Sequence, residues 1–299
     1  MEIEKQLKNL KYGVEKKYPM SSLTSFKVGG PCDYLVKPAD WEEMKMVIAT
    51  CYQFGIFYKV LGKGTNLLVK DGGVRGVIIL MGEPFAYWKL ESDEMLTAGA
   101  ALTLPQLSRA AQEQGLSGLE FASGIPGTLG GGLNMNAGAY GKSLGDLVDK
   151  VTYLTPKGVF KELTSQEAGF AYRESCFLNQ KGVILEALLK LNRDNTDNIK
   201  KRMEEIILKR RNRQPYLPSA GSVFRNPNHM PAGRLIEEAN GKGLQIGGAR
   251  VSEKHANFIV NTGDAKAKDI ISLIIKVKQM VKEHSGTELQ LEVEVVGED

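Results

Sequence analysis

Residues 115–145 read GLSGLEFASGIPGTLGGGLNMNAGAYGKSLG, and ten of the chain's 33 glycines fall in this one stretch. Glycine in the interior of a helix or strand is unfavourable by roughly 0.5–1 kcal/mol relative to alanine. The density therefore predicts neither an ordinary helix nor an ordinary strand, but backbone that turns tightly or lies close to another group. A run of structural turns and a ligand-binding loop both satisfy this pattern.

The other side chains of the stretch favour the ligand-binding interpretation. The stretch contains both side chains that can form hydrogen bonds and apolar side chains. This mixture suits a half-buried, planar ligand with polar edges. The polar residues are Ser123, Thr128, Asn134, Asn136 and Tyr140, and the apolar residues are Ile125, Leu129, Leu133 and Met135.

Composition places the chain among folded globular proteins. Its 299 residues are long enough for two or three domains, and 42% hydrophobic and 25% charged residues argue against disorder. Neither a signal peptide nor 18 consecutive apolar residues occur, so we expect no membrane span and a cytoplasmic location. A net charge of +4 suits an anionic small ligand but not a nucleic-acid partner.

Cysteine and histidine are too few and too scattered for a metal centre. Cys32, Cys51 and Cys176 form no close pair, which makes both structural zinc and a disulfide framework unexpected. The three histidines all lie in the last quarter of the chain, away from the glycine-rich stretch. We expect no metal.

A second glycine loop, Gly62–Asn66, directly follows an expected strand at 58–61. A strand that runs into glycines lets successive N–H groups converge on a phosphate. The loop does not match the dinucleotide-binding fingerprint, which requires glycine where this chain has Leu67. The phosphate-binding loop of nucleoside triphosphatases is not matched either, because Asn136 replaces the first glycine of the nearest candidate, NAGAYGKS.

The expected elements alternate between helices and strands. Capping boxes at Asp40 and Thr103 predict helices that end near residues 55 and 115. A helix at 197–213 and a striped helix at 264–286 follow, and a charged helix is expected at the N-terminus. Expected strands lie at 34–37, 58–61, 77–80, 94–100, 182–191, 257–261 and 288–296, with a hairpin at 150–163.

Two charged stretches allow more than one interpretation. The run Lys209–Arg213 fits a phosphate or nucleic-acid partner, but it also fits a solvated helix end whose positive charge offsets the helix dipole. Phe170–Ser175 is a polar insert before an apolar strand, and Arg173 within it fits a solvated turn.

Taken together, these pieces closely resemble the UDP-N-acetylenolpyruvoylglucosamine reductases. The resemblance covers nearly the whole chain and rests on TSFKVGGP, LGKGTNLLV, GLEFASGIPGTLGG, NAGAYG, FAYRES, SAGSVFRNP, AGRLIEEANGKG and SEKHANFIVN, in this order. It implies an α+β fold with a two-part FAD-binding region of the vanillyl-alcohol-oxidase type (PCMH-like) and a C-terminal α+β substrate-binding domain. The domain boundaries it implies are 1–82, 83–200 and 201–299, with the terminal strand returning toward the flavin.

The resemblance also implies an activity. FAD would be bound noncovalently, because no histidine precedes His229 to form a histidyl link. NADPH would reduce it, and the enolpyruvyl group of a UDP-sugar would then be reduced to UDP-N-acetylmuramate for peptidoglycan. A monomer with a nucleotide-sugar substrate and no nucleic-acid or membrane partner is expected.

Residues of this chain that match the family's motifs are expected to have the roles of the family's site residues. Arg173 would stabilise the developing negative charge, Ser222 would donate the proton, and Glu294 would be the acidic partner. Candidate substrate contacts are Tyr172, Arg225 and Asn226. Candidate FAD contacts are Gly62, Lys63, Gly64, Thr65, Asn66, Ser123, Gly124, Ile125, Pro126, Gly127, Thr128, Gly130, Asn136, Ala137 and Gly138.

Two departures from the family pattern are visible. Val296 stands where the family commonly has arginine, two residues after Glu294. The short spacing between Arg173 and the strand at 182 leaves no room for the tyrosine-bearing substrate loop of one subgroup, so the chain resembles the shorter subgroup. Alternatives are a flavin oxidase for a sugar alcohol or lactone, and a noncatalytic nucleotide-sugar or RNA-binding protein that uses residues 209–213.

Overall fold

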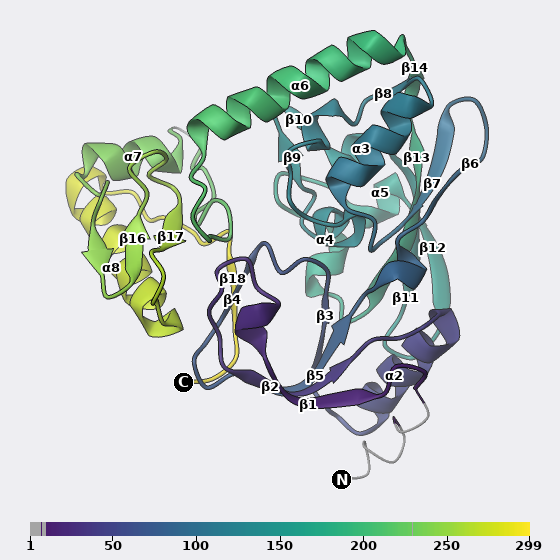
Figure 1. Ribbon diagram of the computed structural model, residues 1–299, viewed down its shortest axis with the longest axis horizontal. Helices are drawn as coiled ribbons and strands as arrows, with labels where there is room; N and C mark the ends of the chain where they lie inside the picture. Colours follow the sequence, from purple (N-terminus) through teal and green to yellow (C-terminus); the bar gives the residue numbers. More distant parts are fainter. Residues whose placement is uncertain (1–6, 8–9, 229) are drawn as a thin grey trace. The chain divides into compact units, whose positions relative to one another are not determined.

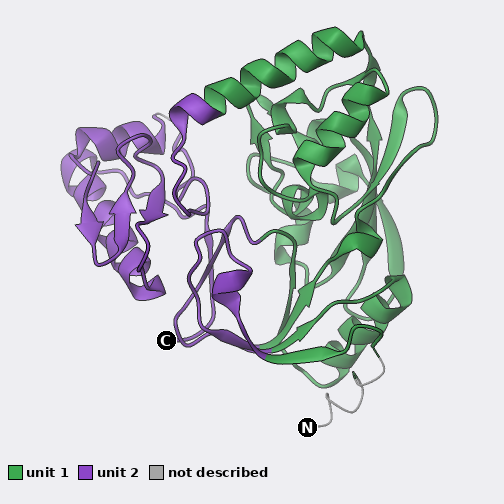
Figure 2. Cartoon of the chain, in the orientation of Figure 1, with its two compact units in different colours: residues 1–16, 34–63, 76–210 green, residues 17–33, 64–75, 211–299 purple. Residues whose placement is uncertain are grey.

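The computed structural model describes residues 7, 10–228 and 230–299, which form two compact units (Figure 2). Unit 1 comprises residues 1–16, 34–63 and 76–210, and unit 2 comprises residues 17–33, 64–75 and 211–299. Each unit is therefore assembled from three separate pieces of the chain. The expected division into consecutive domains at 1–82, 83–200 and 201–299 stays a prediction.

A five-stranded antiparallel sheet forms the larger part of unit 1, in the order β12-β11-β13-β7-β6 (Figure 1). Its core lies between the sheet and the helices α3, α4 and α5, and includes Leu104, Leu107, Leu129 and Leu133 from the helices. The strands are β6 (Trp88–Leu90), β7 (Met95–Gly99), β11 (Val148–Leu154), β12 (Phe160–Thr164) and β13 (Val183–Lys190), and the helices are α3 (Leu104–Glu113), α4 (Leu129–Asn134) and α5 (Ser165–Ala168).

A second sheet, in the order β1-β2-β5-β3, packs on helix α2 (Trp41–Gln53). Met44, Val47 and Ile48 of the helix are fully buried, as the helical spacing of these apolar residues requires. The strands are β1 (Val14–Pro19), β2 (Pro31–Val36), β3 (Tyr58–Leu61) and β5 (Val74–Leu80), and three of them, β1, β2 and β5, run across a boundary between the units.

Unit 2 has its own core. The three-stranded sheet β15-β16-β17 is packed on α7 and α8, and Ile270, Leu273, Ile274, Val277 and Val281 form the buried stripe of α8. The elements are α7 (Ala232–Glu238), β15 (Gln245–Ile246), β16 (Ala249–Val251), β17 (Ile259–Asn261) and α8 (Ala267–Ser285), together with the parallel pair β4 (Leu67–Val69) and β18 (Glu294–Val296).

Most expected elements are confirmed at their predicted places. The side chains of Asp40 and Thr103 accept hydrogen bonds from the N–H groups of Glu43 and Gln106, as the two predicted caps require. The helix at 197–213 is α6 (Thr196–Arg213), and Gly286 ends α8 in the left-handed conformation.

One expectation about the chain ends needs correction, and another lies mainly outside the described residues. The predicted strand at 288–296 is wrong in extent: only Glu294–Val296 is a strand, because residues before it pair only by a single bridge between Leu291 and Phe224. The expected N-terminal helix falls mainly on residues 1–6 and 8–9, which lie outside the described residues. After it, Val14–Pro19 forms a strand rather than a helix.

Three further observations concern the described residues alone. No helix among them is long and apolar enough to cross a membrane. They contain no cluster of His, Cys, Asp and Glu side chains that could hold a metal ion. The three cysteines are free, and burial raises the pKa of Cys51 to about 12, which makes this thiol unreactive near neutral pH.

Candidate functional site

The glycine-rich stretch of unit 1 is a chain of very short elements. It contains β8 (Leu116–Ser117), the 3₁₀ turn Glu120–Ala122, α4, the hairpin strands β9 (Gly138–Ala139) and β10 (Lys142–Ser143), and the 3₁₀ turn Leu144–Asp146. The expectation that no helix forms here is wrong, because α4 carries three consecutive glycines. Thr128 caps this helix by accepting a hydrogen bond from the N–H of Gly131.

Packing explains why α4 contains glycine. A β-carbon on Gly130 would stand 2.8 Å from Cβ of Ala100, and one on Gly132 would stand 2.6 Å from Cδ1 of Leu144. At Gly130 the helix therefore lies too close to Ala100 for a side chain, and at Gly132 a side chain would require Leu144 to shift. Glycine density alone does not identify a ligand site, since part of it serves the protein's own packing.

The first residue of the Gly62–Asn66 loop lies against the second predicted cofactor loop within unit 1. A β-carbon on Gly62 would stand 2.4 Å from Oγ1 of Thr128, so only glycine allows this approach. Gly64 begins the next piece of unit 2, where its φ of +58° and its position against the carbonyl of Leu23 again require glycine. The structure thus brings Gly62 together with Thr128 of the segment 123–130, and the contact of both with FAD stays a prediction.

Three backbone N–H groups of the second loop have no acceptor among the residues that the structure describes. The N–H groups of Ile125, Leu129 and Gly130 are bonded to the carbonyls of Ala122, Leu102 and Ala100. Those of Gly124, Gly127 and Thr128 have no acceptor within the described part of the chain. Adjacent free N–H groups are suited to a phosphate, so this segment fits the diphosphate of FAD.

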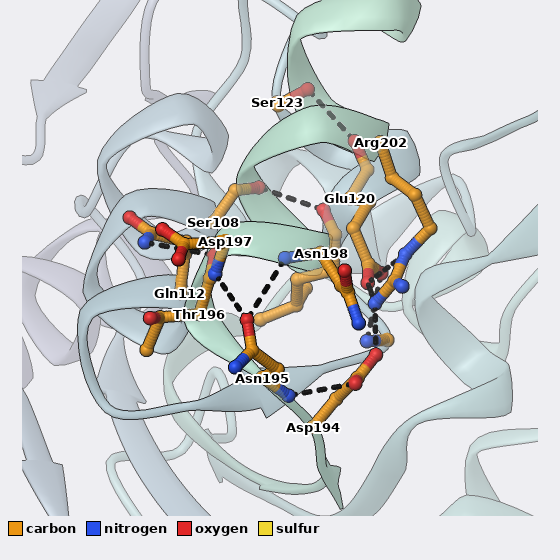
Figure 3. A network of polar contacts seen from close by, with 12 residues as sticks. Ser108, Gln112, Glu120, Ser123, Asp194, Asn195, Thr196, Asp197, Asn198 and Arg202 are labelled. Atoms are coloured by element: carbon orange, nitrogen blue, oxygen red, sulfur yellow. Dashed lines mark hydrogen bonds and ion pairs between the residues drawn. The ribbon is translucent and has the colours of Figure 1, made fainter.

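An ion pair between a buried glutamate and a partly exposed arginine fixes the start of this loop (Figure 3). Glu120 is only 7% exposed, and one of its carboxylate oxygens accepts a hydrogen bond of 2.8 Å from the N–H of Gly118. The other accepts bonds of 3.0 and 2.7 Å from Arg202 of α6, which also contacts Asp194. The hydroxyl of Ser123 donates to the carbonyl of Glu120, so the network reaches the first predicted cofactor residue.

These contacts decide the charge state of Glu120. Burial opposes ionisation, but the hydrogen bonds from Arg202 and from the N–H of Gly118 outweigh it and hold the pKa of Glu120 below its ordinary value. The carboxylate is therefore ionised at neutral pH. Sequence reasoning missed this pair, although a single acidic residue within the apolar run GLEFA is a signal that a partner is required.

Arg173 lies on a tight turn that the glycine-rich stretch holds in place. Ala171 and Glu174 exchange two backbone hydrogen bonds of 3.1 Å, and Arg173 adopts a left-handed φ of +55° inside the turn. One guanidinium nitrogen of Arg173 donates to the carbonyl of Gly138 at 3.3 Å. The guanidinium also stacks on Tyr172, 5.2 Å from the ring centroid. Ala171, Tyr172 and Glu174 are exposed, so the segment is a surface turn, and the contacts with Gly138 and Tyr172 orient the guanidinium within it.

Two side chains tie the same turn to the segment around α4. The amide of Asn136 donates to the carbonyl of Ala171 and accepts from the N–H of Gly145, both at 2.8 Å. The hydroxyl of Ser175 donates to the carbonyl of Asn134 at 2.6 Å. Asn136 was predicted to contact the cofactor, and its role there stays a prediction, while the structure shows that its side chain positions the Arg173 turn.

Ser222, in unit 2, lies between Gly221 and two residues, Val223 and Phe224, that Asn257 holds by hydrogen bonds. We call these contacts of Asn257 the clamp. Gly221 has a φ of +75°, a left-handed conformation that glycine adopts without strain. The buried Asn257 then bonds Phe224 on both sides: its amide oxygen accepts from the N–H at 2.9 Å, and its amide nitrogen donates to the carbonyl at 2.8 Å. The backbone carbonyl of Asn257 accepts a hydrogen bond from the N–H of Val223 at 2.8 Å.

The segment that carries Glu294 is attached to this clamp. The N–H of Glu292 donates to the carbonyl of Val223 at 2.8 Å, and the N–H of Glu294 donates to the carbonyl of Asn66 at 3.0 Å. The side-chain amide of Asn66 donates to the carbonyl of Glu292 at 3.0 Å. Unit 2 thus brings together the segments of Ser222, Glu294 and Asn66, three residues predicted for the same site.

The remaining predicted substrate residues are placed as follows. The exposed Asn226 accepts a hydrogen bond from the N–H of Ala232 at 3.0 Å and so caps the start of α7. Arg225 donates its N–H to the carbonyl of Gln290. Tyr172 is 55% exposed beside Arg173. Arg173 and Tyr172 belong to unit 1, whereas Ser222, Arg225, Asn226 and Glu294 belong to unit 2.

Comparison with known proteins first identifies the class. Residues 32–164 match the sequence profile of the FAD binding domain family, and residues 213–296 match that of the UDP-N-acetylenolpyruvoylglucosamine reductase C-terminal domain. An alkyldihydroxyacetonephosphate synthase, 17% identical with a TM-score of 0.50 over 64% of this chain and 40% of its own, shares the fold. The chain is an α+β flavoprotein with an FAD-binding region of the predicted type.

The relatives then identify the family. UDP-N-acetylenolpyruvoylglucosamine reductases from Bacillus licheniformis and Clostridioides difficile are 42% and 44% identical, over 98% and 94% of this chain and 97% and 92% of their own. The crystal structure of the Thermus caldophilus enzyme superposes with a TM-score of 0.83 at 38% identity, over 94% of this chain and 98% of its own. The chain belongs to the UDP-N-acetylenolpyruvoylglucosamine reductase family.

Proposed function

We propose that this chain reduces the enolpyruvyl group of UDP-N-acetylglucosamine enolpyruvate with NADPH and FAD, forming UDP-N-acetylmuramate for peptidoglycan. The observation that carries this proposal is the similarity to reductases of this name along nearly the whole chain, in both the FAD-binding and the C-terminal region. The resemblance of its motifs, noted from the sequence, points to the same reaction.

FAD, when bound, supplies the hydride chemistry by accepting hydride from NADPH and delivering it to the terminal carbon of the enolpyruvyl group. The residues that would hold it are the predicted set in 62–66, 123–130 and 136–138. The free N–H groups of Gly124, Gly127 and Thr128 support a phosphate contact there. Binding is proposed to be noncovalent.

Arg173 has the chemistry to stabilise the negative charge that develops on the substrate after hydride addition. A guanidinium held in a fixed orientation can bind a carboxylate or enolate through two parallel hydrogen bonds. The turn around Arg173 supplies the fixed orientation through Asn136 and Ser175. These contacts support Arg173 as the residue that binds the carboxylate end of the substrate.

Ser222 is proposed to deliver the proton to the carbon next to the carboxylate. A serine hydroxyl is a weak acid, so it can act only on a strongly basic carbon and from a rigid position. The clamp that Asn257 forms on Val223 and Phe224 supports such rigidity. Glu294, whose segment is bonded to the same clamp through Glu292, is proposed to orient the proton donor or the enol.

The decisive experiment separates the two halves of the reaction. In the Ser222→Ala variant, NADPH should still bleach the flavin absorption at the wild-type rate, whereas formation of UDP-N-acetylmuramate should fall by orders of magnitude. Ser219→Ala is the matched control and should retain both steps. A purified protein that binds no flavin would refute the proposed function, and near-normal turnover of Ser222→Ala would remove Ser222 from its role.

The same experiment distinguishes the alternative oxidase. Rapid reoxidation of the reduced protein by oxygen in the presence of a sugar alcohol or lactone, without a response to the enolpyruvyl sugar, would favour that activity. A monomeric state, a cytoplasmic location and the absence of a nucleic-acid partner are further parts of the proposal. Size-exclusion chromatography with light scattering tests the first of these.

A further inference from the structure

One basic residue at the end of α6 differs from its neighbours. Lys209, Arg211 and Arg213 are exposed, whereas Arg210 is half-buried. Its side chain lies directly against the second cofactor loop: a β-carbon on Gly124 would stand 2.4 Å from Cδ of Arg210 and 3.1 Å from its Nε. Both residues belong to unit 1. The prediction of a solvated helix end therefore holds for Lys209, Arg211 and Arg213 but not for Arg210.

Arg210 also differs from the other half-buried arginine of the same helix. Arg202 forms ion pairs with Glu120 and Asp194. Arg210, within the residues that the structure describes, has neither a hydrogen-bond acceptor nor an acidic partner. Burial lowers the pKa of Arg210, while Tyr140 acts in the opposite direction, but a guanidinium remains charged in proteins. A cation withdrawn from water without a counter-ion is unfavourable unless a ligand supplies one.

The surroundings of Arg210 favour an anion. The N–H groups of Gly124, Gly127 and Thr128, which have no acceptor in the described part of the chain, lie on the same loop that Arg210 covers. A guanidinium and adjacent backbone N–H groups together form a preferred site for phosphate oxygens. We propose that Arg210 binds the diphosphate of a nucleotide ligand against Gly124.

This inference rests on the proposed function, in which two ligands carry a diphosphate: FAD and the UDP-sugar. The experiment therefore measures both affinities on the flavin-loaded protein. FAD release on dilution is followed by the rise in flavin fluorescence, and binding of UDP is followed by the change in the flavin absorption spectrum. Arg210→Met retains the length of the side chain and removes the charge. Lys209→Met makes the same charge change one residue earlier, at an exposed position.

Arg210→Met should weaken one of the two ligands about 10- to 100-fold, the effect of losing a charge-assisted contact to phosphate. If Arg210 binds FAD, the dissociation constant of FAD should rise and that of UDP should not change. If Arg210 binds the nucleotide sugar, the dissociation constant of UDP should rise and that of FAD should not change. Arg210→Lys should restore part of the loss. The affinity of the same ligand should fall more steeply with salt in the wild type than in Arg210→Met, a difference that a purely structural role would not produce.

A second variant moves the guanidinium without removing it. Gly124 has no left-handed φ, so alanine fits its backbone, but the new methyl group would displace the side chain of Arg210. Gly124→Ala should therefore weaken the same ligand as Arg210→Met, and the double variant should be less than additive. Additive effects would mean that Gly124 and Arg210 act separately.

Unchanged affinities for both FAD and UDP in Arg210→Met, within twofold of Lys209→Met, would overturn the proposal. That result is distinguishable from failure of the proposed function, because it requires a wild-type protein that binds both ligands. A wild-type protein that binds neither would overturn the function and this inference together.

Discussion

The turn that carries Arg173 in unit 1 and the segment that carries Ser222 in unit 2 are held in place by different means. In unit 1 the proposed functional residue itself adopts the left-handed conformation, which is unfavourable by roughly 1–2 kcal/mol for a residue with a β-carbon. In unit 2 the left-handed residue is Gly221, next to Ser222, where no such penalty arises. Strain therefore resides in the arginine turn and not in the serine segment.

The supports differ in kind as well. In unit 1 the side chains of Asn136 and Ser175 bond the arginine turn to the segment around α4, and the charged pair of Glu120 and Arg202 fixes the cofactor loop of the same unit. A single neutral amide, Asn257, makes the corresponding contacts in unit 2. We expect unit 2 to be more sensitive to one substitution, and unit 1 to depend on charge and pH.

The largest effect is expected for Asn257→Leu. This change leaves the buried N–H and carbonyl of Phe224 without side-chain partners, which should lower the free energy of unfolding by about 3 kcal/mol. Product formation should fall at least tenfold while flavin reduction by NADPH is retained. Thermal unfolding and stopped-flow absorbance measure the two effects, and Asn212→Leu at an exposed position is the control. Wild-type product formation in a folded Asn257→Leu protein would contradict the positioning role.

A smaller effect is expected for Asn136→Gly in unit 1. Glycine accepts the φ of +45° at this position, so the change removes the two side-chain hydrogen bonds without backbone strain. We expect a loss of about 2 kcal/mol in the free energy of unfolding, and a lower kcat because the Arg173 turn loosens. Asn240→Gly, at an exposed position with a φ of +59°, is the matched control. If kcat is unchanged, Asn136 does not position Arg173.

The smallest effect is expected for Glu120→Gln. The side chain of Arg202 is 43% exposed, which weakens the ion pair, so the loss at pH 7 should be about 1 kcal/mol. The pKa of Glu120 is lowered in the folded protein, so this stabilisation is present above the ordinary glutamate pKa of about 4.3 and is lost as the pH falls through the lower, folded value.

Unfolding midpoints of wild type and Glu120→Gln should therefore converge under acid conditions and differ at neutral pH. Asp194→Asn, which removes the more exposed partner of Arg202, should have less effect. A difference between wild type and Glu120→Gln that grows as the pH falls would contradict the assigned ion pair.

Local signals predicted much of the fold. The caps at Asp40 and Thr103, the stripe of α8 and the hairpin of β11 and β12 each depend on residues close together in the sequence, and all four are observed. The helix α4 could not be predicted from propensity, because its glycines are required by Ala100 and Leu144, which are distant in the chain or beyond the helix end. The extent of the terminal strand was predicted wrongly for the same reason, because its partner, Leu67–Val69, is distant in the chain.

The candidate site shows the same limit. Motifs identified Arg173, Ser222 and the two glycine loops, since glycine spacing and sequence resemblance are visible along the chain. Asn257, Glu120 and Arg210 were not singled out, because each derives its importance from a partner in another element. A side chain that acts by contacting a distant backbone leaves no periodic signal in its own neighbourhood.

The hydrogen bond from Asn66 to the carbonyl of Glu292 joins residues 226 positions apart. A ribosome adds about 5–20 residues per second, so residue 66 emerges roughly 10 to 45 s before its partner is made. During synthesis, β4 therefore lacks its strand partner until β18 has been made. Released chains truncated before residue 292 should be more prone to aggregation and to binding by chaperones than the full-length chain.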